Sequence, residues 1–186
     1  MENLVNLAMD DGIAVVTVDN PPVNALSHAV RAGLQDCLRT ALNRAQTKAV
    51  VICCAGRSFF SGADIREFGK PPQAPVLPDL INELEAAPVP VIAAMHGNAL
   101  GGGLVIATAC DLVVSARMAR WSMPEVPKGF FPPWGMAPLM ARVGPVTAQL
   151  IAFGIEEMDG EDALRLGVAD RLAADGQALV AACDRA

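Results

Sequence analysis

Two short turns in the sequence are suited to presenting backbone N–H groups to a ligand. In the first, Gly62 permits a sharp bend after two phenylalanines, and Ala63 is expected to open a short helix. In the second, the glycines at 101–103 expose the start of a helix directly after a predicted strand. Amides at a helix start lack intrahelical partners, so they can hold a phosphate or an oxygen that becomes negative during a reaction. The alternative role is structural, because glycines also let a helix pack close to a sheet.

Few side chains are available for proton transfer or metal binding. The chain has no tyrosine and two histidines, so acid–base chemistry must use a carboxylate, a histidine or a lysine, and a His-rich metal site cannot form. Taken alone, Glu125 is interpreted as a solvated turn carboxylate, Asp64 as a stabiliser of a helix N-terminus, and His96 as a structural hydrogen-bonding residue. The cysteines contain no Cys-x-x-Cys pair, and we expect buried, reduced thiols rather than a metal site. They are Cys37, Cys53, Cys54, Cys110 and Cys183.

The elements that must position the two turns follow an α/β order. Apolar runs predict strands at 4–9, 13–18, 49–54, 89–95 and 111–115, the first two forming a hairpin. Helical spacing predicts helices at 27–45, 79–86, 101–109, 135–143, 145–153 and 160–166. The continuous β-branched runs are typical of buried parallel strands, and ligands of such sheets bind where strands run into helix N-termini.

Composition and charge exclude several classes of function. The chain of 186 residues is 53% apolar, which suits one compact domain, and its net charge of −6 without a basic run argues against a nucleic-acid partner. The uncharged stretch 86–110 is interrupted by Pro88, Pro90 and the glycines, so it is interpreted as strand, turn and helix rather than as a membrane span. Because the first ten residues lack a basic n-region, we expect a soluble, cytoplasmic protein.

Several segments together resemble the crotonase superfamily, the enoyl-CoA hydratase/isomerase group. In chain order they are Pro22 to Leu26, Phe60 to Ile65, His96 to Gly103, Met123 to Val126, and Asp162 to Val168. The order and spacing match over nearly the whole chain. The resemblance implies an α/β fold of the crotonase (ClpP/crotonase) type, a spiral of strand-helix repeats with a helical C-terminal part. It also implies an enzyme that acts on acyl-CoA thioesters.

The resemblance implies roles for residues in the two turns. By matching position, the amides of Ala63 and Gly102 would form an oxyanion hole for the thioester carbonyl, which lowers the cost of forming an enolate. Coenzyme A would enter as part of the substrate, so no separate cofactor and no metal are expected. The residues implied to line the substrate and coenzyme A path are Val23, Ala25, Arg57, Ser61, Asp64, Ile65, Phe68, Gly101, Val105, Pro132 and Trp134.

The acid–base residues depart from the hydratase pattern of this family. Hydratases use two glutamates, and the position of the first is occupied by Val105, three residues after Gly102 on the same helix face. The second glutamate matches Glu125, in the motif Met-Pro-Glu. Enoyl-CoA isomerases resemble this single-glutamate arrangement. We therefore expect Glu125 to move a proton between two carbons of an enolate, while Val105 excludes water and raises the carboxyl pKa.

A second departure is the aromatic segment at 129–136, where most relatives have a smaller, glycine-rich turn. Phe131, Pro132 and Trp134 either reshape the acyl site or pack as core. Hydroxyacyl-CoA hydrolases of the superfamily have an aspartate in this turn, and this segment has none, which argues against that reaction.

Three functions stay open at the level of the sequence. Double-bond isomerisation is favoured; the alternatives are a hydratase that places water with Glu125 alone, and a non-catalytic acyl-CoA-binding or assembly subunit. Relatives generally continue for several helices after Gly167-Val168, and those helices cover the pocket and support trimers. We therefore expect a single core domain over 1–186 whose C-terminal helical lid and trimerisation region is short or missing. The partners implied are a small acyl-CoA substrate and further copies of the chain, in a trimer or hexamer.

Overall fold

The computed structural model describes residues 3–154, 157–174 and 177, which form an α/β fold with two sheets; Cys183 lies outside these residues. The main sheet has the spatial order β1 (Val5–Asp10), β2 (Ile13–Val18), β3 (Ala49–Cys54), β4 (Val91–Met95), β6 (Leu112–Ala116) and β8 (Arg171–Ala173). Strands β1 and β2 form the predicted antiparallel hairpin. Every later pair of neighbours is parallel, as the β-branched runs predicted.

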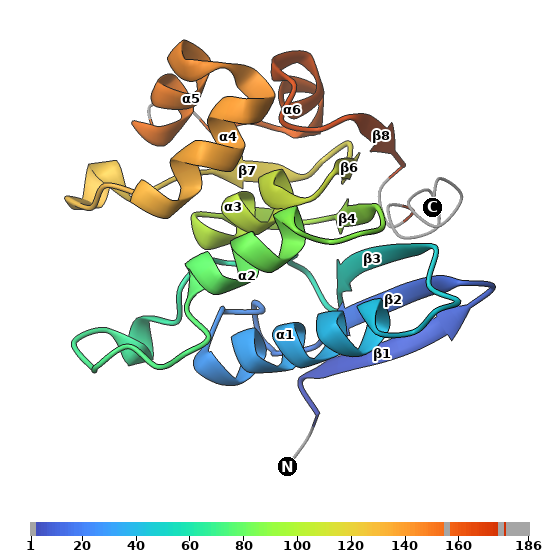
Figure 1. Ribbon diagram of the computed structural model, residues 1–186. Coiled ribbons are helices and arrows are strands. Elements are labelled where there is room, and N and C mark those ends of the chain that lie inside the picture. Colours follow the sequence, from blue (N-terminus) through green and yellow to red (C-terminus); the bar gives the residue numbers. More distant parts are fainter. Residues whose placement is uncertain (1–2, 155–156, 175–176, 178–186) are drawn as a thin grey trace.

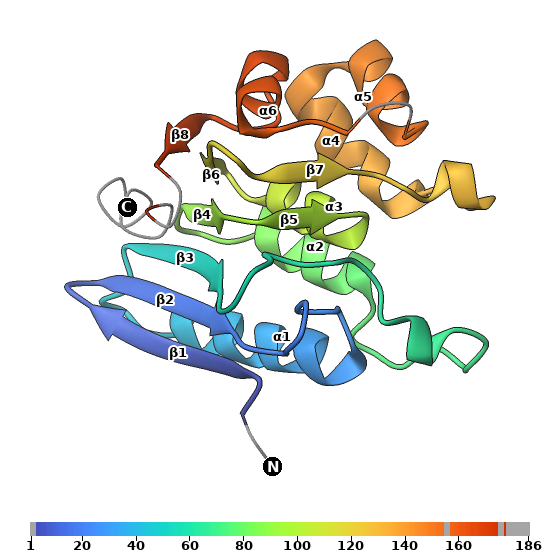
Figure 2. The same ribbon diagram turned by 180° about the vertical axis from the view of Figure 1, so that it is seen from behind.

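The helices of the described residues pack mainly on one face of this sheet. They are α1 (His28–Leu42), α2 (Leu77–Glu85), α3 (Gly102–Ala109), α4 (Met136–Val143), α5 (Pro145–Ala152) and α6 (Gly160–Leu166). Figure 1 shows α1, α2 and α3 in front of the strands, and Figure 2, seen from behind, shows the strands in front. Leu34, Ile52 and Leu104 are buried together in the main hydrophobic core between these layers.

A second, shorter parallel ladder runs beside the main sheet. Its strands are β5 (Asn98–Leu100) and β7 (Arg120–Ser122), which lie side by side in Figure 2. Single bridges extend the row, and these pair Leu26 with Ala63, Phe60 with Ala99, and Trp121 with Met158. Each of the segments from Leu26 to β7 follows a strand of the main sheet. The chain therefore winds as the repeated spiral that the family resemblance implied.

Some predicted boundaries were wrong. Helix α2 begins at Leu77 instead of Asp79, because Pro78 fits the first turn of a helix. Ala63 does not open a helix; the following 3₁₀ helix spans Ile65–Glu67, and the Asp64 side chain caps it by accepting from the Arg66 N–H at 3.0 Å. Strands β5, β7 and β8 were missed, since three residues are too few for a periodic pattern.

The uncharged stretch 86–110 is divided as its prolines and glycines predicted. It contributes β4, β5 and α3, each shorter than ten residues. Across the described part of the chain, no helix combines the length and the apolar character needed to cross a bilayer.

Gly103 allows the first turn of α3 to approach the segment after β3. A Cβ built on Gly103 would lie 2.4 Å from the main-chain oxygen of Phe60, which already accepts from the Leu100 N–H at 2.9 Å. A Cβ built on Gly102 would meet two side-chain ends, with Leu26 Cδ1 nearest at 3.0 Å, and would lie at an ordinary contact distance of 3.9 Å from the Gly62 Cα. The two neighbouring glycines therefore differ in how rigid their surroundings are.

This difference predicts unequal effects of two alanine substitutions on stability. Gly103→Ala should lower the free energy of unfolding by about 2 to 3 kcal/mol, because backbone must shift to admit the methyl group. Gly102→Ala should lower it by less than about 1 kcal/mol, since a flexible side chain can move away. Urea unfolding followed by circular dichroism measures both values. Equal losses for the two variants would contradict the packing described here.

Candidate active site

The two glycine-containing turns meet in the structure. A Cβ built on Gly62 would lie 2.9 Å from the Leu100 main-chain oxygen and 3.7 Å from the Gly102 nitrogen. Gly62 has a φ of +93°, which side-chain-bearing residues rarely adopt. The absence of a side chain at Gly62 therefore permits both the bend and the contact between the turns.

Among the described residues, each turn leaves backbone amides without a hydrogen-bond partner, including those of Ala63 and Gly102. Across the residues that the structure describes, neither the Ala63 N–H nor the Gly102 N–H donates a hydrogen bond to the protein. Ala63 is held by its bridge to Leu26, whose own N–H donates to the Gly62 oxygen at 2.9 Å. Gly102 is the first residue of α3, and the preceding Gly101 N–H donates to the Ser122 oxygen at 2.9 Å. Both amides are thus fixed by neighbouring main chain and available to an acceptor.

The Glu125 carboxyl lies against the second turn. A Cβ built on Gly101 would lie 2.0 Å from Glu125 Oε1, so only a glycine leaves room for the carboxyl in this position. Glu125 Oε2 is buried and has no hydrogen-bond partner among the described residues. Burial raises the pKa of Glu125, although its own main-chain N–H and the Lys128 ammonium act in the opposite direction. Glu125 is therefore not the solvated turn carboxylate that its local sequence suggested.

Val105 forms an apolar wall near Glu125. It lies one turn after Gly102 on α3 and is 3% exposed. Its packing against the start of α4 is close, because a Cβ built on Gly135 would lie 2.4 Å from Val105 Cγ2. The position of the first glutamate in hydratases of the resembled family thus carries no polar side-chain atom.

A cavity of about 620 Å³ joins these groups. Ten of the sequence-predicted site residues line it: Ser61, Ala63, Ile65, Phe68, Gly101, Gly102, Val105, Glu125, Pro132 and Trp134. Phe131 and Trp134 line it and are 60% and 57% exposed, so the alternative that they pack as core is wrong. The cavity mouth also carries a contact between the Phe68 and Phe130 rings, whose centroids lie 6.2 Å apart.

Four predicted residues do not line this cavity: Val23, Ala25, Arg57 and Asp64. Asp64 is buried and its carboxylate is bound by the Arg66 guanidinium, which lowers the Asp64 pKa. Arg57 is exposed and is not part of the cavity wall. His96, interpreted as structural, contacts the Gly56 oxygen through Nε2 at 2.9 Å.

Several lining residues were missed by sequence reasoning. Those from the first half of the chain are Leu26, Arg31, Pro72, Val76, Leu77 and Pro78, and those near Glu125 include Lys128 and Phe130. Most carry no chemical signal, because they reach the cavity only through tertiary packing. Arg31 is an exception, because a charged residue on the inner face of a predicted helix could have indicated that it lines the cavity.

The arrangement can bind an oxygen and move a proton beside it. Two unpaired amides suit an oxygen that gains negative charge, and a carboxyl with a raised pKa suits proton transfer to or from carbon. Among the described residues, no group of three or more His, Cys, Asp or Glu side chains is placed to hold a metal ion.

Similar proteins have the same fold and related descriptions. The chain is 38% identical to a probable enoyl-CoA hydratase from Bacillus subtilis, over 89% of this chain and 67% of that protein. It is 40% identical to the peroxisomal bifunctional enzyme of Danio rerio, over 86% of this chain and 22% of that protein, so it spans about a fifth of that relative's length.

Solved structures agree with these relatives. A probable enoyl-CoA hydratase/isomerase from Mycobacterium abscessus is 32% identical, with a TM-score of 0.88 over 100% of this chain and 74% of that chain. An enoyl-CoA hydratase from Thermoplasma volcanium, 24% identical with a TM-score of 0.89 over 99% of this chain and 77% of that chain, shows the shared fold. The family model for enoyl-CoA hydratase/isomerase matches residues 8–186, and the chain therefore belongs to the enoyl-CoA hydratase/isomerase family.

Proposed function

We propose that the protein isomerises the double bond of an enoyl-CoA thioester, with Glu125 as the one acid–base residue. The observation that carries this proposal is the combination of one buried carboxyl with an apolar wall at Val105 and two unpaired amides. Coenzyme A is part of the substrate. No separate cofactor enters the proposed reaction, because each step moves a proton between carbon and a carboxyl group.

The proposed reaction begins with the thioester oxygen of a 3-enoyl substrate between the Ala63 and Gly102 amides. The Glu125 carboxylate takes a proton from C2, and the electron pair left behind moves to the thioester oxygen, giving a dienolate. The two N–H groups stabilise this negative oxygen, with about 3 to 4 kcal/mol for each donor by analogy with other oxyanion sites. Protonated Glu125 then gives its proton to C4, so that the double bond lies between C2 and C3.

The environment of Glu125 supports both halves of this cycle. A carboxyl must lose its proton readily enough to act as a base and hold it long enough to act as an acid. The raised pKa of Glu125 reduces the difference between its pKa and that of the weakly acidic substrate carbon C2. Within the described part of the chain, its buried Oε2 has no partner that would fix the proton in place.

Hydration of a 2-enoyl thioester is the second candidate. It is favoured by the Bacillus subtilis relative, which is described as a probable enoyl-CoA hydratase. Water addition requires a water held in position for attack on C3, and Val105 supplies no hydrogen-bonding atom for that task. Glu125 would have to position and activate the water alone, which makes isomerisation the better supported proposal.

Substitution of the proposed acid–base residue tests the reaction. Glu125→Gln should lower kcat for a 3-enoyl-CoA substrate by about 10³-fold, because the amide cannot carry the proton between carbons. Glu85→Gln, on the exposed end of α2, is the matched control and should keep kcat within twofold. Rates on 3-enoyl-CoA and 2-enoyl-CoA are measured side by side. Unchanged turnover in Glu125→Gln would overturn the assignment.

The raised pKa of Glu125 predicts the pH dependence of activity. The carboxylate form of Glu125 starts the reaction, so kcat/KM should fall as the pH is lowered through the Glu125 pKa. This acid limb should lie above the ordinary glutamate pKa of about 4.3. Lys128 favours the charged carboxylate, so Lys128→Met should raise the Glu125 pKa and move this acid limb to higher pH. Lys48→Met, at the turn between α1 and β3, should leave the limb in place. A limb that moves to lower pH in Lys128→Met would contradict this account.

A further inference from the structure

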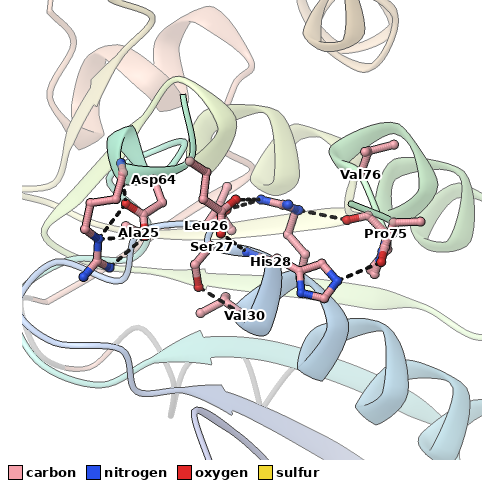
Figure 3. A network of polar contacts seen from close by, with 12 residues as sticks. Ala25, Leu26, Ser27, His28, Val30, Asp64, Pro75 and Val76 are labelled. Carbon is pink, nitrogen blue, oxygen red and sulfur yellow. Dashed lines mark hydrogen bonds and ion pairs between the residues drawn. The ribbon is translucent and has the colours of Figure 1, made fainter. Parts of the chain in front are cut away.

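A buried arginine on α1 has no place in the proposed proton transfer. The Arg31 side chain is 13% exposed and lines the cavity. Its guanidinium donates to the Leu26 oxygen and, at 2.9 Å, to the Pro75 oxygen, and it forms an ion pair with Glu67 Oε2 at 3.2 Å. In Figure 3, one side chain donates hydrogen bonds to both the Leu26 oxygen and the Pro75 oxygen. One group thus joins Leu26, five residues earlier in the chain, to Glu67 and Pro75 at two points of the segment 64–76.

Each of these three contact residues borders the proposed oxyanion site or the cavity wall. Leu26 pairs with Ala63 in the short ladder, and its Cδ1 lies 3.0 Å from a Cβ built on Gly102, so it contacts both turns. Glu67 lies between the lining residues Ile65 and Phe68. Pro75 directly precedes the lining residue Val76, at the start of α2.

The partner of Arg31 is itself tied to the beginning of α1. Glu67 Oε1 accepts from the His28 main-chain N–H at 2.6 Å, while Oε2 faces Arg31. The His28 ring adds a second link, since Nε2 lies 2.8 Å from the Ala74 oxygen. The segment 64–76 is therefore attached to α1 near both of its ends. Figure 3 shows the contacts near the second end, around His28 and Pro75.

Stability alone does not account for this arrangement. The ion pair is partly buried, with the Arg31 side chain 13% and the Glu67 side chain 33% exposed, and well-packed apolar residues often serve a fold equally well even where a pair is fully buried. A planar guanidinium, however, can bind acceptors in several fixed directions, which a lysine cannot reproduce. The geometry of Arg31 suits a requirement for precise placement of main chain.

We propose that Arg31 is a positioning residue, which aligns the Ala63 amide with the Gly102 amide by holding Leu26 and the segment 64–76. This inference rests on the proposed function, because it assigns the two amides to one thioester oxygen. Arg31 acts through the main chain and is not itself the acid–base group. Its removal should therefore weaken polarisation of the thioester carbonyl before it alters the chemistry of Glu125.

The test is the infrared C=O stretching frequency of bound hexanoyl-CoA carrying ¹³C at the thioester carbonyl. In the wild-type protein this band should lie at lower frequency than in buffer, because two N–H donors polarise the bond. In Arg31→Met the shift should shrink, and kcat for a 3-enoyl-CoA should fall by about 10²-fold. Arg31→Lys should restore only part of either value. The frequency of the band from bound hexanoyl-CoA does not depend on what fraction of the protein is folded.

Matched variants separate positioning from stability. Arg142→Met removes a comparably buried arginine, 12% exposed, which binds the Thr108 and Cys110 oxygens away from the cavity. It should lower the free energy of unfolding and leave the band unshifted relative to wild type. Glu67→Gln keeps the shape of the Arg31 partner without its charge, and it should also shrink the shift. It serves as the test if Arg31→Met does not fold.

The outcomes distinguish the two proposals. If hexanoyl-CoA binds to the wild-type protein but its carbonyl band stays at the frequency measured in buffer, the amide site is contradicted, and with it the proposed function. If the band is shifted in the wild-type protein and equally shifted in Arg31→Met, the role of Arg31 alone is overturned. Where Arg31→Met does not fold, the same result in Glu67→Gln has that meaning.

Discussion

The contact between the turns at Gly62 and Gly102 is the constraint on which the rest of the site depends. A side chain at Gly62 would meet the Leu100 oxygen, and one at Gly101 would meet the Glu125 carboxyl. These close approaches bring two unpaired amides and one acid group to the same cavity. The spiral of strand-helix repeats supplies the turns, since each follows a parallel strand of the main sheet and is joined to its neighbour by the short ladder.

The character of the cavity is set by what surrounds Glu125. Burial makes its charged form costly and raises its pKa, while Val105 adds an apolar surface and Lys128 partly offsets the effect of burial. In the proposed reaction, a carboxyl in these surroundings exchanges a proton with carbon and does not position a water molecule. The proposed isomerisation follows from this balance between desolvation and charge, together with amides that stabilise the enolate oxygen.

Much of the fold was accessible from sequence because the apolar patterns were long. The β-branched run at 49–54 predicted a buried parallel strand, and the motifs around Ala63, Gly102 and Glu125 predicted residues that meet in one cavity. The three-residue strands β5, β7 and β8 were too short for periodicity. The contribution of Arg31 was also missed, because its acceptors are main-chain oxygens whose proximity arises only when distant segments pack.

In the proposed isomerisation, one carboxyl in an apolar cavity moves a proton along the substrate without adding water. Mass spectrometry of the product formed from a 3-enoyl-CoA in D₂O tests this most directly. We expect a 2-enoyl-CoA in which a measurable fraction carries no deuterium, because Glu125 returns the proton that it removed. A 3-hydroxyacyl-CoA as the main product, or a 2-enoyl-CoA fully labelled from the first turnover, would contradict this proposal.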